Sequence, residues 1–229
     1  MQQRDERWRA VLPWAPYLIV SAWHLYGTLP SVSGIAGPTK GLLMPLLLVT
    51  LLSLVPRPTI GLAPTAVAAL VLSWLGDVTI GNFLVGLAFS LLAQVAYAGL
   101  FGRMPGRIRP WAGAVFVYCL ALCLWLVPQA GTMAVPVVLY AAAIALMAFL
   151  AAKVSLVTFV GACFFMASDS LLAVDRFVST FEIPYASLLV MSTYLLGQGL
   201  IVLGVGRRLT LAGEGVGQKR LGHTFAAAG

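Results

Sequence analysis

Apolar residues occur along this chain in long stretches, which are interrupted by short segments rich in Pro, Gly or charge. The interruptions are sharpest at residues 56–58, 102–110 and 128–131. Leu, Ala and Val within the stretches do not alternate with polar residues, which favours helices over barrel strands. The stretches predict eight helices, at about 11–28, 40–56, 61–80, 82–101, 110–127, 133–151, 154–174 and 185–205.

Composition indicates that these helices lie in a membrane. Of the 229 residues, 61% are hydrophobic and 9% are charged, whereas a soluble domain has about 45–50% apolar and about 25% charged residues. A membrane span needs about 20 apolar residues, and each stretch is close to that length. We therefore expect an all-α, multi-spanning integral membrane protein whose residues 1–229 form a single transmembrane domain. The expected location is the cell membrane, which in a bacterium is the inner membrane.

The basic residues predict the orientation of the spans. An even number of spans places both termini on one side of the membrane. If that side is the cytoplasm, twelve of the 14 Lys and Arg residues face it, and only Lys40 and Arg176 face the other side. Cytoplasmic loops are enriched in Lys and Arg, so the net charge of +7 indicates topology and not a nucleic-acid partner. Residues 207–229, rich in Gly and Ala, are expected to form a flexible cytoplasmic tail.

Few ionisable residues interrupt the spans. With this topology His24, Lys40, Asp77, Asn82 and Asp169 come from five different helices and share one depth in the outer half of the bundle. A charged side chain at the centre of a lone helix costs about 2.5–3.5 kcal/mol on insertion scales, so such residues usually face the bundle interior. The pattern predicts a shared polar pocket, although Lys40 and Asn82 alone are equally well explained as helix-end residues.

Two helices extend this pocket inward through stripes of small or polar side chains at helical spacing. One stripe consists of Asn82, Gly86, Ser90, Gln94 and Tyr97. The other consists of Ser187, Met191, Tyr194 and Gln198. Such stripes also serve ordinary helix packing in membranes, so the larger polar side chains of the two stripes are candidates for either role.

The pocket favours acid/base chemistry. The chain has two His, three Cys within apolar stretches, and no Gly-rich phosphate loop, serine nucleophile elbow or HExxH motif. We therefore expect no metal, no organic cofactor and no disulfide framework. Burial favours the neutral form of a carboxyl group, and a nearby cation favours the ionised form. Two aspartates with a Lys and a His at similar depth can thus supply a general acid and a general base.

Five segments of the chain form an ordered set. They are Thr39 to Pro45 (TKGLLMP), Leu75 to Asp77 (LGD), Phe89 to Tyr97, Phe164 to Phe177 (FFMASDSLLAVDRF) and Thr193 to Gln198 (TYLLGQ). Their order and spacing resemble the YhhN family of membrane lysoplasmalogenases. The resemblance implies an eight-helix membrane fold with Asp77 and Asp169 as the catalytic pair. It also implies that Lys40, Tyr97, Tyr194 and Gln198 are pocket positions. Together with these four, our candidate substrate-binding residues are His24, Asn82, Gln94 and Ser168.

Three positions depart from the family pattern. Gln94 stands where the family often has His, Gly41 where Pro often follows the Lys, and Asp175 where Asn is common. A His at position 94 therefore cannot be a required general base in this chain.

The resemblance implies hydrolysis of the vinyl ether of a lysoplasmalogen, such as lysoplasmenyl-ethanolamine or -choline, to a fatty aldehyde and a glycerophospho-alcohol. We predict that one aspartate donates a proton and the other activates water. Lys40 is expected to pair with the substrate phosphate, and the lipid chain is expected to lie between helices. The expected partners are this lysophospholipid and the lipids of the membrane.

Two other classes compete with a hydrolase. A proton-coupled transporter or carrier also uses intramembrane Asp, His and Lys sets, but it needs access from both sides, whereas these polar residues gather on one side. An intramembrane aspartyl protease would use two aspartates, and Leu75-Gly-Asp77 partly matches the GxGD motif of that class. However, Trp74 stands where the motif has Gly, and the last helix has no Pro-Ala-Leu stretch. The transporter is therefore the main alternative.

Overall fold

A computed structural model describes residues 11–29, 32, 36–55 and 62–226, with the side chains of the last helix described to Leu211. Within these residues the chain forms eight α-helices and no strand, which confirms the all-α fold. The helices are α2 (Ala15–Gly27), α3 (Ala36–Leu54), α4 (Ala63–Thr79), α5 (Phe83–Arg103), α6 (Ala114–Leu126), α7 (Ala134–Val154), α8 (Leu156–Phe177) and α9 (Ala186–Ala226). Short 3-10 turns precede α2 and α6 and link α6 to α7.

Six helical segments are long and apolar enough to cross a membrane. They are Gly37–Leu54, Phe83–Arg103, Pro110–Gln129, Gly131–Val154, Leu156–Phe177 and Ala186–Leu211. The helices α2 and α4 have 13 and 17 residues, which at 1.5 Å per residue is about 20 and 26 Å against a hydrocarbon core of about 30 Å. The chain is thus a multi-pass membrane protein, and the crossing of the membrane by α2 and α4 stays a prediction.

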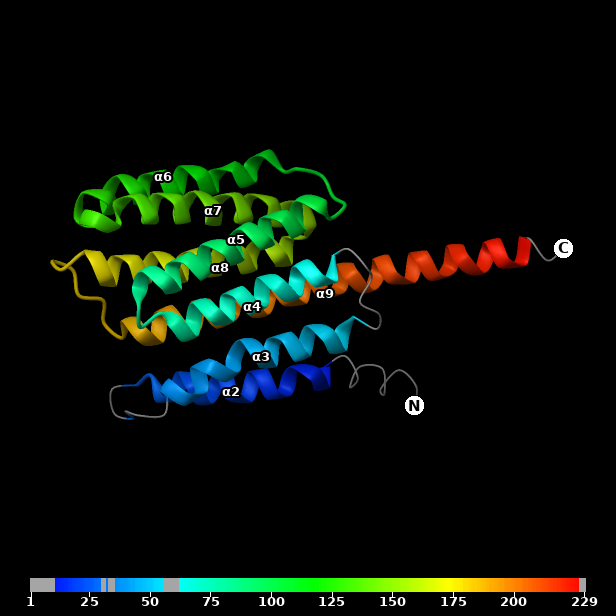
Figure 1. Cartoon of the computed structure of the whole chain (residues 1–229), viewed down its shortest axis with the longest axis horizontal. Helices are drawn as coiled ribbons and strands as arrows, with labels where there is room; N and C mark the ends of the chain where they lie inside the picture. Colours follow the sequence, from blue (N-terminus) through cyan, green and yellow to red (C-terminus); the bar gives the residue numbers. More distant parts are fainter. Residues whose placement is uncertain (1–10, 30–31, 33–35, 56–61, 227–229) are drawn as a thin grey trace.

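Successive helices run in opposite directions, so the bundle has two ends (Figure 1). We call the end where α5 and α7 finish and α8 begins the basic end. The described cations at or near it are Arg103, Arg107, Arg109, Lys153, Arg207 and Arg208. Lys40 and Arg176 lie toward the opposite end, together with Asp175 at the end of α8 and Glu182 in the connection between α8 and α9. The described cations therefore sort between the ends as the sequence predicts, whereas Arg57 and residues 4–9 lie outside the described residues.

The last helix is longer than the sequence indicates. The expected helix ends at residue 205, but α9 continues to Ala226 and projects beyond the basic end (Figure 1). The glycines in this segment lower its helix propensity, but each keeps its backbone donor and acceptor, so the helix can continue. The flexibility of residues 207–229 stays a prediction.

The pair α8 and α9 forms the most extensive helix contact in the bundle. A Cβ on Gly197 would lie 2.7 Å from the backbone nitrogen of Phe165, and a Cβ on Gly161 would lie 2.8 Å from the backbone oxygen of Gly197. Only glycine fits at such distances, and small residues let membrane helices approach closely. This contact fixes the register of α9 on α8, the two helices that carry Tyr194 and Asp169.

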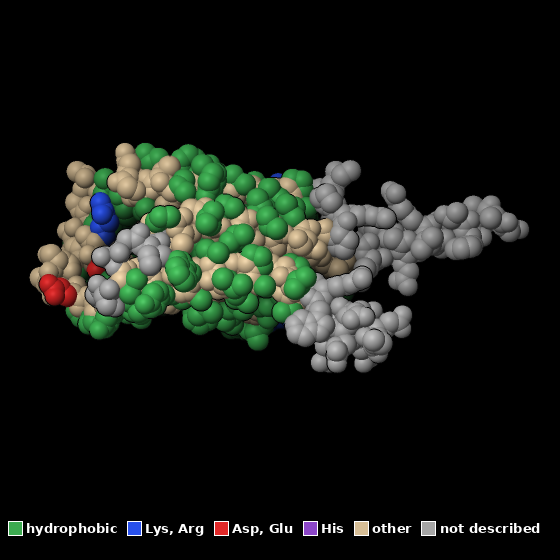
Figure 2. Space-filling view, turned by 90° about the horizontal axis from the view of Figure 1, so that it is seen from below, with side chains coloured by type: hydrophobic (Ala, Val, Ile, Leu, Met, Phe, Trp, Pro, Cys, Tyr) green, Lys and Arg blue, Asp and Glu red, His purple; other side chains and the backbone are tan. Residues whose placement is uncertain are grey.

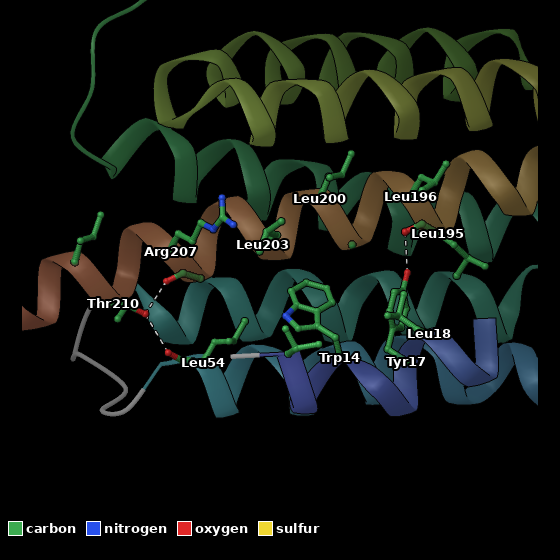
Figure 3. Close-up of a pocket in the computed structure, with 14 residues that line it drawn as sticks. Trp14, Tyr17, Leu18, Leu54, Leu195, Leu196, Leu200, Leu203, Arg207 and Thr210 are labelled. Atoms are coloured by element: carbon green, nitrogen blue, oxygen red, sulfur yellow. Dashed lines mark hydrogen bonds between the residues drawn. The ribbon is translucent and has the colours of Figure 1, made fainter. Parts of the chain in front are cut away.

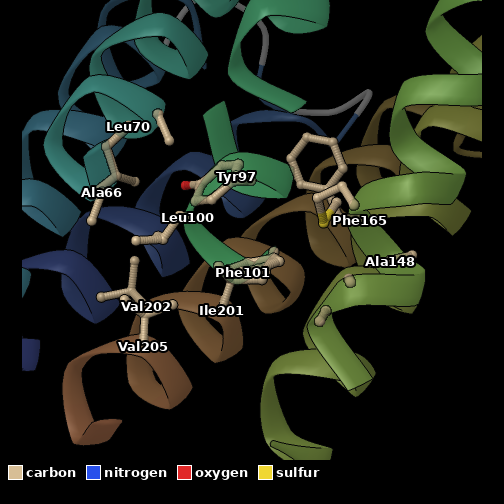
Figure 4. Packing of buried hydrophobic residues seen from close by; sticks show 14 of the residues in the cluster. Ala66, Leu70, Tyr97, Leu100, Phe101, Ala148, Phe165, Ile201, Val202 and Val205 are labelled. Carbon is tan, nitrogen blue, oxygen red and sulfur yellow. The ribbon is translucent and has the colours of Figure 1, made fainter. Parts of the chain in front are cut away.

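Apolar side chains fill the interior and also cover the outside. Phe101 and Ile201 are fully buried among side chains of α4, α5, α7, α8 and α9 (Figure 4). Large apolar residues on α6 point outward, for example Leu124, which is 71% exposed. Hydrophobic side chains cover much of the described bundle surface in Figure 2, as expected of a surface that faces lipid. The three cysteines are free.

Candidate active site

A cavity of about 210 Å³ lies inside the half of the bundle opposite the basic end. Six helices contribute to its wall: α3, α4, α5, α7, α8 and α9. Its polar lining consists of Lys40, Ser73, Asp77, Ser90, Gln94, Tyr140, Ser168, Asp169 and Tyr194. Its apolar lining includes Ile80, Phe165, Leu172, Val190 and Met191. The structure thus brings six of the ten predicted site residues to one enclosed space.

Asp77 lies in the last turn of α4 and faces α9 across the cavity. The hydroxyl group of Tyr194 donates a hydrogen bond of 2.6 Å to Oδ2 of Asp77. Lys40, one turn into α3, lines the same cavity and supplies its one described cation. This side of the cavity therefore combines a carboxyl group, a phenol and an ammonium group.

Asp169 lies in the middle of α8 and has a matching partner on α7. The hydroxyl group of Tyr140 donates a hydrogen bond to Oδ2 of Asp169. Gln94 of α5 donates in turn from Nε2 to the oxygen of Tyr140, at 3.4 Å. Each aspartate is thus oriented by a tyrosine from a neighbouring helix, and buried polar groups of this kind need such partners. The neighbouring Ser168 hydroxyl donates to the backbone oxygen of Val190, at 2.8 Å.

Tyr97 and Gln198 support the cavity from behind and do not line it. Tyr97 donates from its hydroxyl group to Oε1 of Gln198, at 3.0 Å, and Nε2 of Gln198 donates to Oγ of Ser73, at 3.4 Å. Both side chains are buried, and Ser73 belongs to the lining. The pair therefore holds the lining in place, and direct contact of either residue with a substrate stays a prediction.

His24 and Asn82 lie outside the cavity lining. Nδ1 of His24 lies 2.8 Å from the hydroxyl oxygen of Thr39, so this histidine contacts the residue before Lys40. Asn82 caps α5, because its side-chain oxygen accepts a hydrogen bond from the backbone N–H of Val85. Asn82 is exposed and acts as a helix cap. Contact of either residue with a substrate stays a prediction.

Sequence reasoning missed Tyr140, which contacts Asp169 and Gln94. Its signal was present, because it is the one side chain with a polar group between Ala134 and Ala152. A lone hydroxyl group in a long apolar helix needs a partner inside the bundle. The search for stripes of several polar residues overlooked such a single position.

A smaller cavity of about 70 Å³ leads from Asp169 along α5, α7 and α8. It shares Tyr140 and Asp169 with the main cavity and ends beside Phe83 and Phe177. These two rings meet edge to face with centroids 5.7 Å apart, and the guanidinium carbon of Arg176 lies 4.4 Å from the centroid of Phe83. The smaller cavity thus ends at the Phe83–Phe177 contact, on which the guanidinium group of Arg176 packs.

An apolar groove of about 740 Å³ lies between α2 and α9 (Figure 3). Tyr17 lies at one end and donates to the backbone oxygen of Leu195, at 2.8 Å. Arg207 lies toward the other end and is the one charged residue of the lining. The groove can hold hydrocarbon, but it offers no carboxyl group for acid/base chemistry.

The cavity with two aspartates therefore has the chemical groups of an acid/base site. Within the described residues, no group of three or more His, Cys, Asp or Glu side chains is arranged to hold a metal ion. What the lining offers is two carboxyl groups, two phenols and one ammonium group between apolar walls. Such a set can donate a proton, accept a proton and bind an anionic group.

Comparison with known proteins adds the following. The family model described as the YhhN family matches residues 36–205. Lysoplasmalogenase TMEM86A of Bos taurus is 31% identical over 160 residues, which covers 64% of this chain and 64% of the relative. Lysoplasmalogenase TMEM86A of Homo sapiens matches with the same identity and coverage. The match thus spans less than two thirds of each relative's length, and no solved structure matches the chain.

Proposed function

Because this chain belongs to the YhhN family, we propose that it is a lysoplasmalogenase. It hydrolyses the vinyl ether bond of a lysoplasmalogen to a fatty aldehyde and a glycerophospho-alcohol. The observation that carries this proposal is the pair Asp77 and Asp169 in one enclosed cavity, each accepting a hydrogen bond from a tyrosine. The relatives named lysoplasmalogenase support the choice of substrate class.

The first step is transfer of a proton from one aspartic acid to the outer alkene carbon of the vinyl ether. The electrons of the double bond form the new C–H bond, and the carbon next to the ether oxygen becomes an oxocarbenium ion. The carboxylate of the other aspartate stabilises this cation at close range, as negative groups do in a site with few waters. The tyrosines keep each carboxyl group in its orientation.

The second step is addition of water to the oxocarbenium carbon. The carboxylate of the second aspartate accepts a proton from the attacking water, and a hemiacetal results. The hemiacetal C–O bond to the glycerol then breaks. The second aspartic acid donates its proton to the leaving oxygen, and the hemiacetal hydroxyl group gives its proton to the carboxylate of the first aspartate, which yields the free alcohol and the aldehyde. One water is consumed, and both aspartates regain their starting state.

The substrate phosphate binds at Lys40, the described cation of the cavity. The reacting double bond then lies between Asp77 and Asp169, and the hydrocarbon chain extends into the smaller cavity beside Asp169. Arg176, stacked on Phe83 at the end of that cavity, stands where the lipid would pass from the membrane. The apolar walls exclude water from the chain, while the polar lining admits the single water that reacts.

For the membrane topology we propose eight spans with both termini in the cytoplasm, so that the catalytic cavity opens in the outer half. The sorting of cations between the two ends supports this orientation. Single cysteines at position 108 and at position 180, introduced after Cys119, Cys123 and Cys163 are replaced by serine, test it by labelling in intact cells. We expect labelling of position 180 only from outside, and the opposite result would reverse the topology.

The function is tested with purified protein and lysoplasmenyl-ethanolamine, with its saturated-ether analogue as the control. In deuterated water we expect a fatty aldehyde that carries one deuterium on the carbon next to the aldehyde group, because the proton from the aspartic acid is delivered there. The saturated ether should yield no product. Release of a free fatty acid, or no release at all, would reject the proposal, and transport of protons or solute by vesicles containing the protein would then favour a carrier.

A further inference from the structure

The basic end of the bundle carries a second site, which the reaction does not use. A pocket of about 520 Å³ is lined by the cations Arg107, Arg109, Lys153 and Arg208, together with Gly106, Ile108, Pro110 and Trp111. These cations come from three parts of the chain: the segment between α5 and α6, the end of α7, and α9. Residues far apart in the sequence thus converge on one hollow.

The pocket is built by contacts that fix its walls. A Cβ on Gly106 would lie 2.1 Å from the backbone oxygen of Lys153, so only glycine lets the segment pack this closely on the end of α7. Nζ of Lys153 donates to the backbone oxygen of Gly102, and Nε of Arg208 donates to that of Val154, each at 2.8 Å. Two of the four cations, Lys153 and Arg208, are therefore held in position by carbonyl groups at helix ends, which attract positive charge.

Among the described residues, no carboxyl group lines this pocket. The described carboxyl groups, those of Asp77, Asp169, Asp175 and Glu182, all lie in the other half of the bundle. Convergent positive charge without an anionic partner in its lining favours binding of an anion. Phosphate suits arginine best, because the guanidinium group offers paired donors.

An aromatic residue indicates that the anion belongs to a lipid. Trp111 is 52% exposed and packs edge to face on Phe159, with ring centroids 4.9 Å apart. The guanidinium group of Arg109 lies 5.9 Å from the centroid of Trp111. Tryptophan concentrates at the depth of lipid head groups, so the pocket lies where the phosphates of a leaflet lie.

We propose that this pocket binds the phosphate of an anionic phospholipid in the leaflet at the basic end. Basic pockets between membrane helices recognise lipid head groups in this way. The site does not depend on the proposed reaction, since it lies in the other half of the bundle. Positive charge that only orients the protein would need no convergence, and Arg103 and Arg207 show this: they lie at the same end but do not line the pocket.

The test is native mass spectrometry of the whole protein in detergent, titrated with phosphatidylglycerol, phosphatidylcholine or glycerol phosphate. The pocket variant is Arg107→Gln with Arg109→Gln, and the matched control is Arg103→Gln with Arg207→Gln, which removes the same charge from the same end. We expect the pocket variant to lower the affinity for phosphatidylglycerol at least about tenfold, and the control to lower it less than about threefold. The wild type should bind phosphatidylcholine and glycerol phosphate at least about tenfold more weakly than phosphatidylglycerol.

Three results would overturn the proposal. Equal losses in the pocket variant and the control would mean that the whole basic end attracts lipid without a site. Equal binding of phosphatidylcholine would mean that lipid only coats the protein, and tight binding of glycerol phosphate would mean that the ligand is a soluble phosphate. Elution profiles check folding, and if the double variant aggregates, Arg109→Gln is compared with Arg103→Gln in the same titration.

Discussion

The two halves of this bundle hold charged groups in different surroundings. The cavity with the two aspartates is small and enclosed, and its two carboxyl groups accept hydrogen bonds from phenol hydroxyl groups of neighbouring helices. The basic pocket is larger, and two of its cations donate to backbone oxygens at helix ends. A charge inside a membrane bundle is costly unless hydrogen bonds compensate it, whereas solvent screens charges at an open end.

The comparison teaches where substitutions should affect chemistry and where they should affect association. In the cavity each side chain is held by a specific partner, so a loss of one group changes the geometry of the reacting atoms. At the basic end four cations line one pocket, so a loss of one cation leaves the others and changes affinity by a modest factor. The basic-end variants described above test association, and the following substitutions test the cavity, in order of decreasing expected effect.

Asp77→Asn and Asp169→Asn should each reduce aldehyde release by about 10²–10⁴-fold, the usual loss when a general acid or base is removed. Asn keeps a side-chain oxygen that can accept the tyrosine hydrogen bond, so the helices should still pack. It cannot donate a proton as an acid or accept one at neutral pH. Single-turnover assays on the purified variants measure the loss.

The double variant gives the sharper result. If the two aspartates act as one unit, the double loss should be close to the larger single loss, because such residues are non-additive. Asp175→Asn is the matched control, since this carboxyl group lies outside the cavity lining. Near-normal turnover of either folded single variant would show that this aspartate has only a structural role.

Much of this architecture could be predicted from the sequence. The interruptions in the apolar pattern located all eight helices, since clusters of Pro, Gly and charge mark the connections between them. The two aspartates were found because a carboxyl group inside an apolar stretch is conspicuous. Both signals are local, and they need no knowledge of how the helices pack.

The parts that were not predicted depend on packing. Tyr97 and Gln198 lie on polar stripes that favour a pocket, yet they bond to each other behind the lining, because helix rotation decides which side chains reach the cavity. Tyr140 reaches Asp169 only through the contact of α7 with α8. Asn82 caps α5, which is one of the two roles that its position at the start of a predicted helix left open. The spacing of polar residues along the sequence does not show which of these side chains reach the cavity.

Tyr140→Phe and Tyr194→Phe should each lower turnover by about 10–100-fold. A hydrogen bond to a charged group is worth about 1.5–3 kcal/mol, and about 1.4 kcal/mol of barrier is tenfold in rate. Tyr118→Phe is the matched control, because Tyr118 donates to Ser170 on α8, one residue from Asp169, and does not line the cavity. Equal losses of turnover in all three variants would mean that these tyrosine hydroxyl groups stabilise the packing of the helices and do not act through the aspartates.

Lys40→Met should raise the Michaelis constant for lysoplasmenyl-ethanolamine by about tenfold with little change in turnover. Removal of an interaction made equally with substrate and transition state acts on binding alone. A vinyl ether without a phosphate group serves as the matched substrate, and its Michaelis constant should not change. A fall in turnover for both substrates would instead place Lys40 in the chemistry of Asp77.

Tyr97→Phe should have the smallest effect of the series. It removes the hydrogen bond to Gln198 behind the cavity, and a net hydrogen bond contributes about 0.5–1.5 kcal/mol to the free energy of unfolding. The ring, which packs on Phe101 with centroids 5.8 Å apart, is kept. We expect a slightly lower melting temperature in detergent and a loss of turnover below about fivefold, because Gln198 still donates to Ser73. A loss as large as that of Tyr194→Phe would show that Tyr97 contacts the substrate in the working enzyme, and the division between lining and supporting residues would then have to be redrawn.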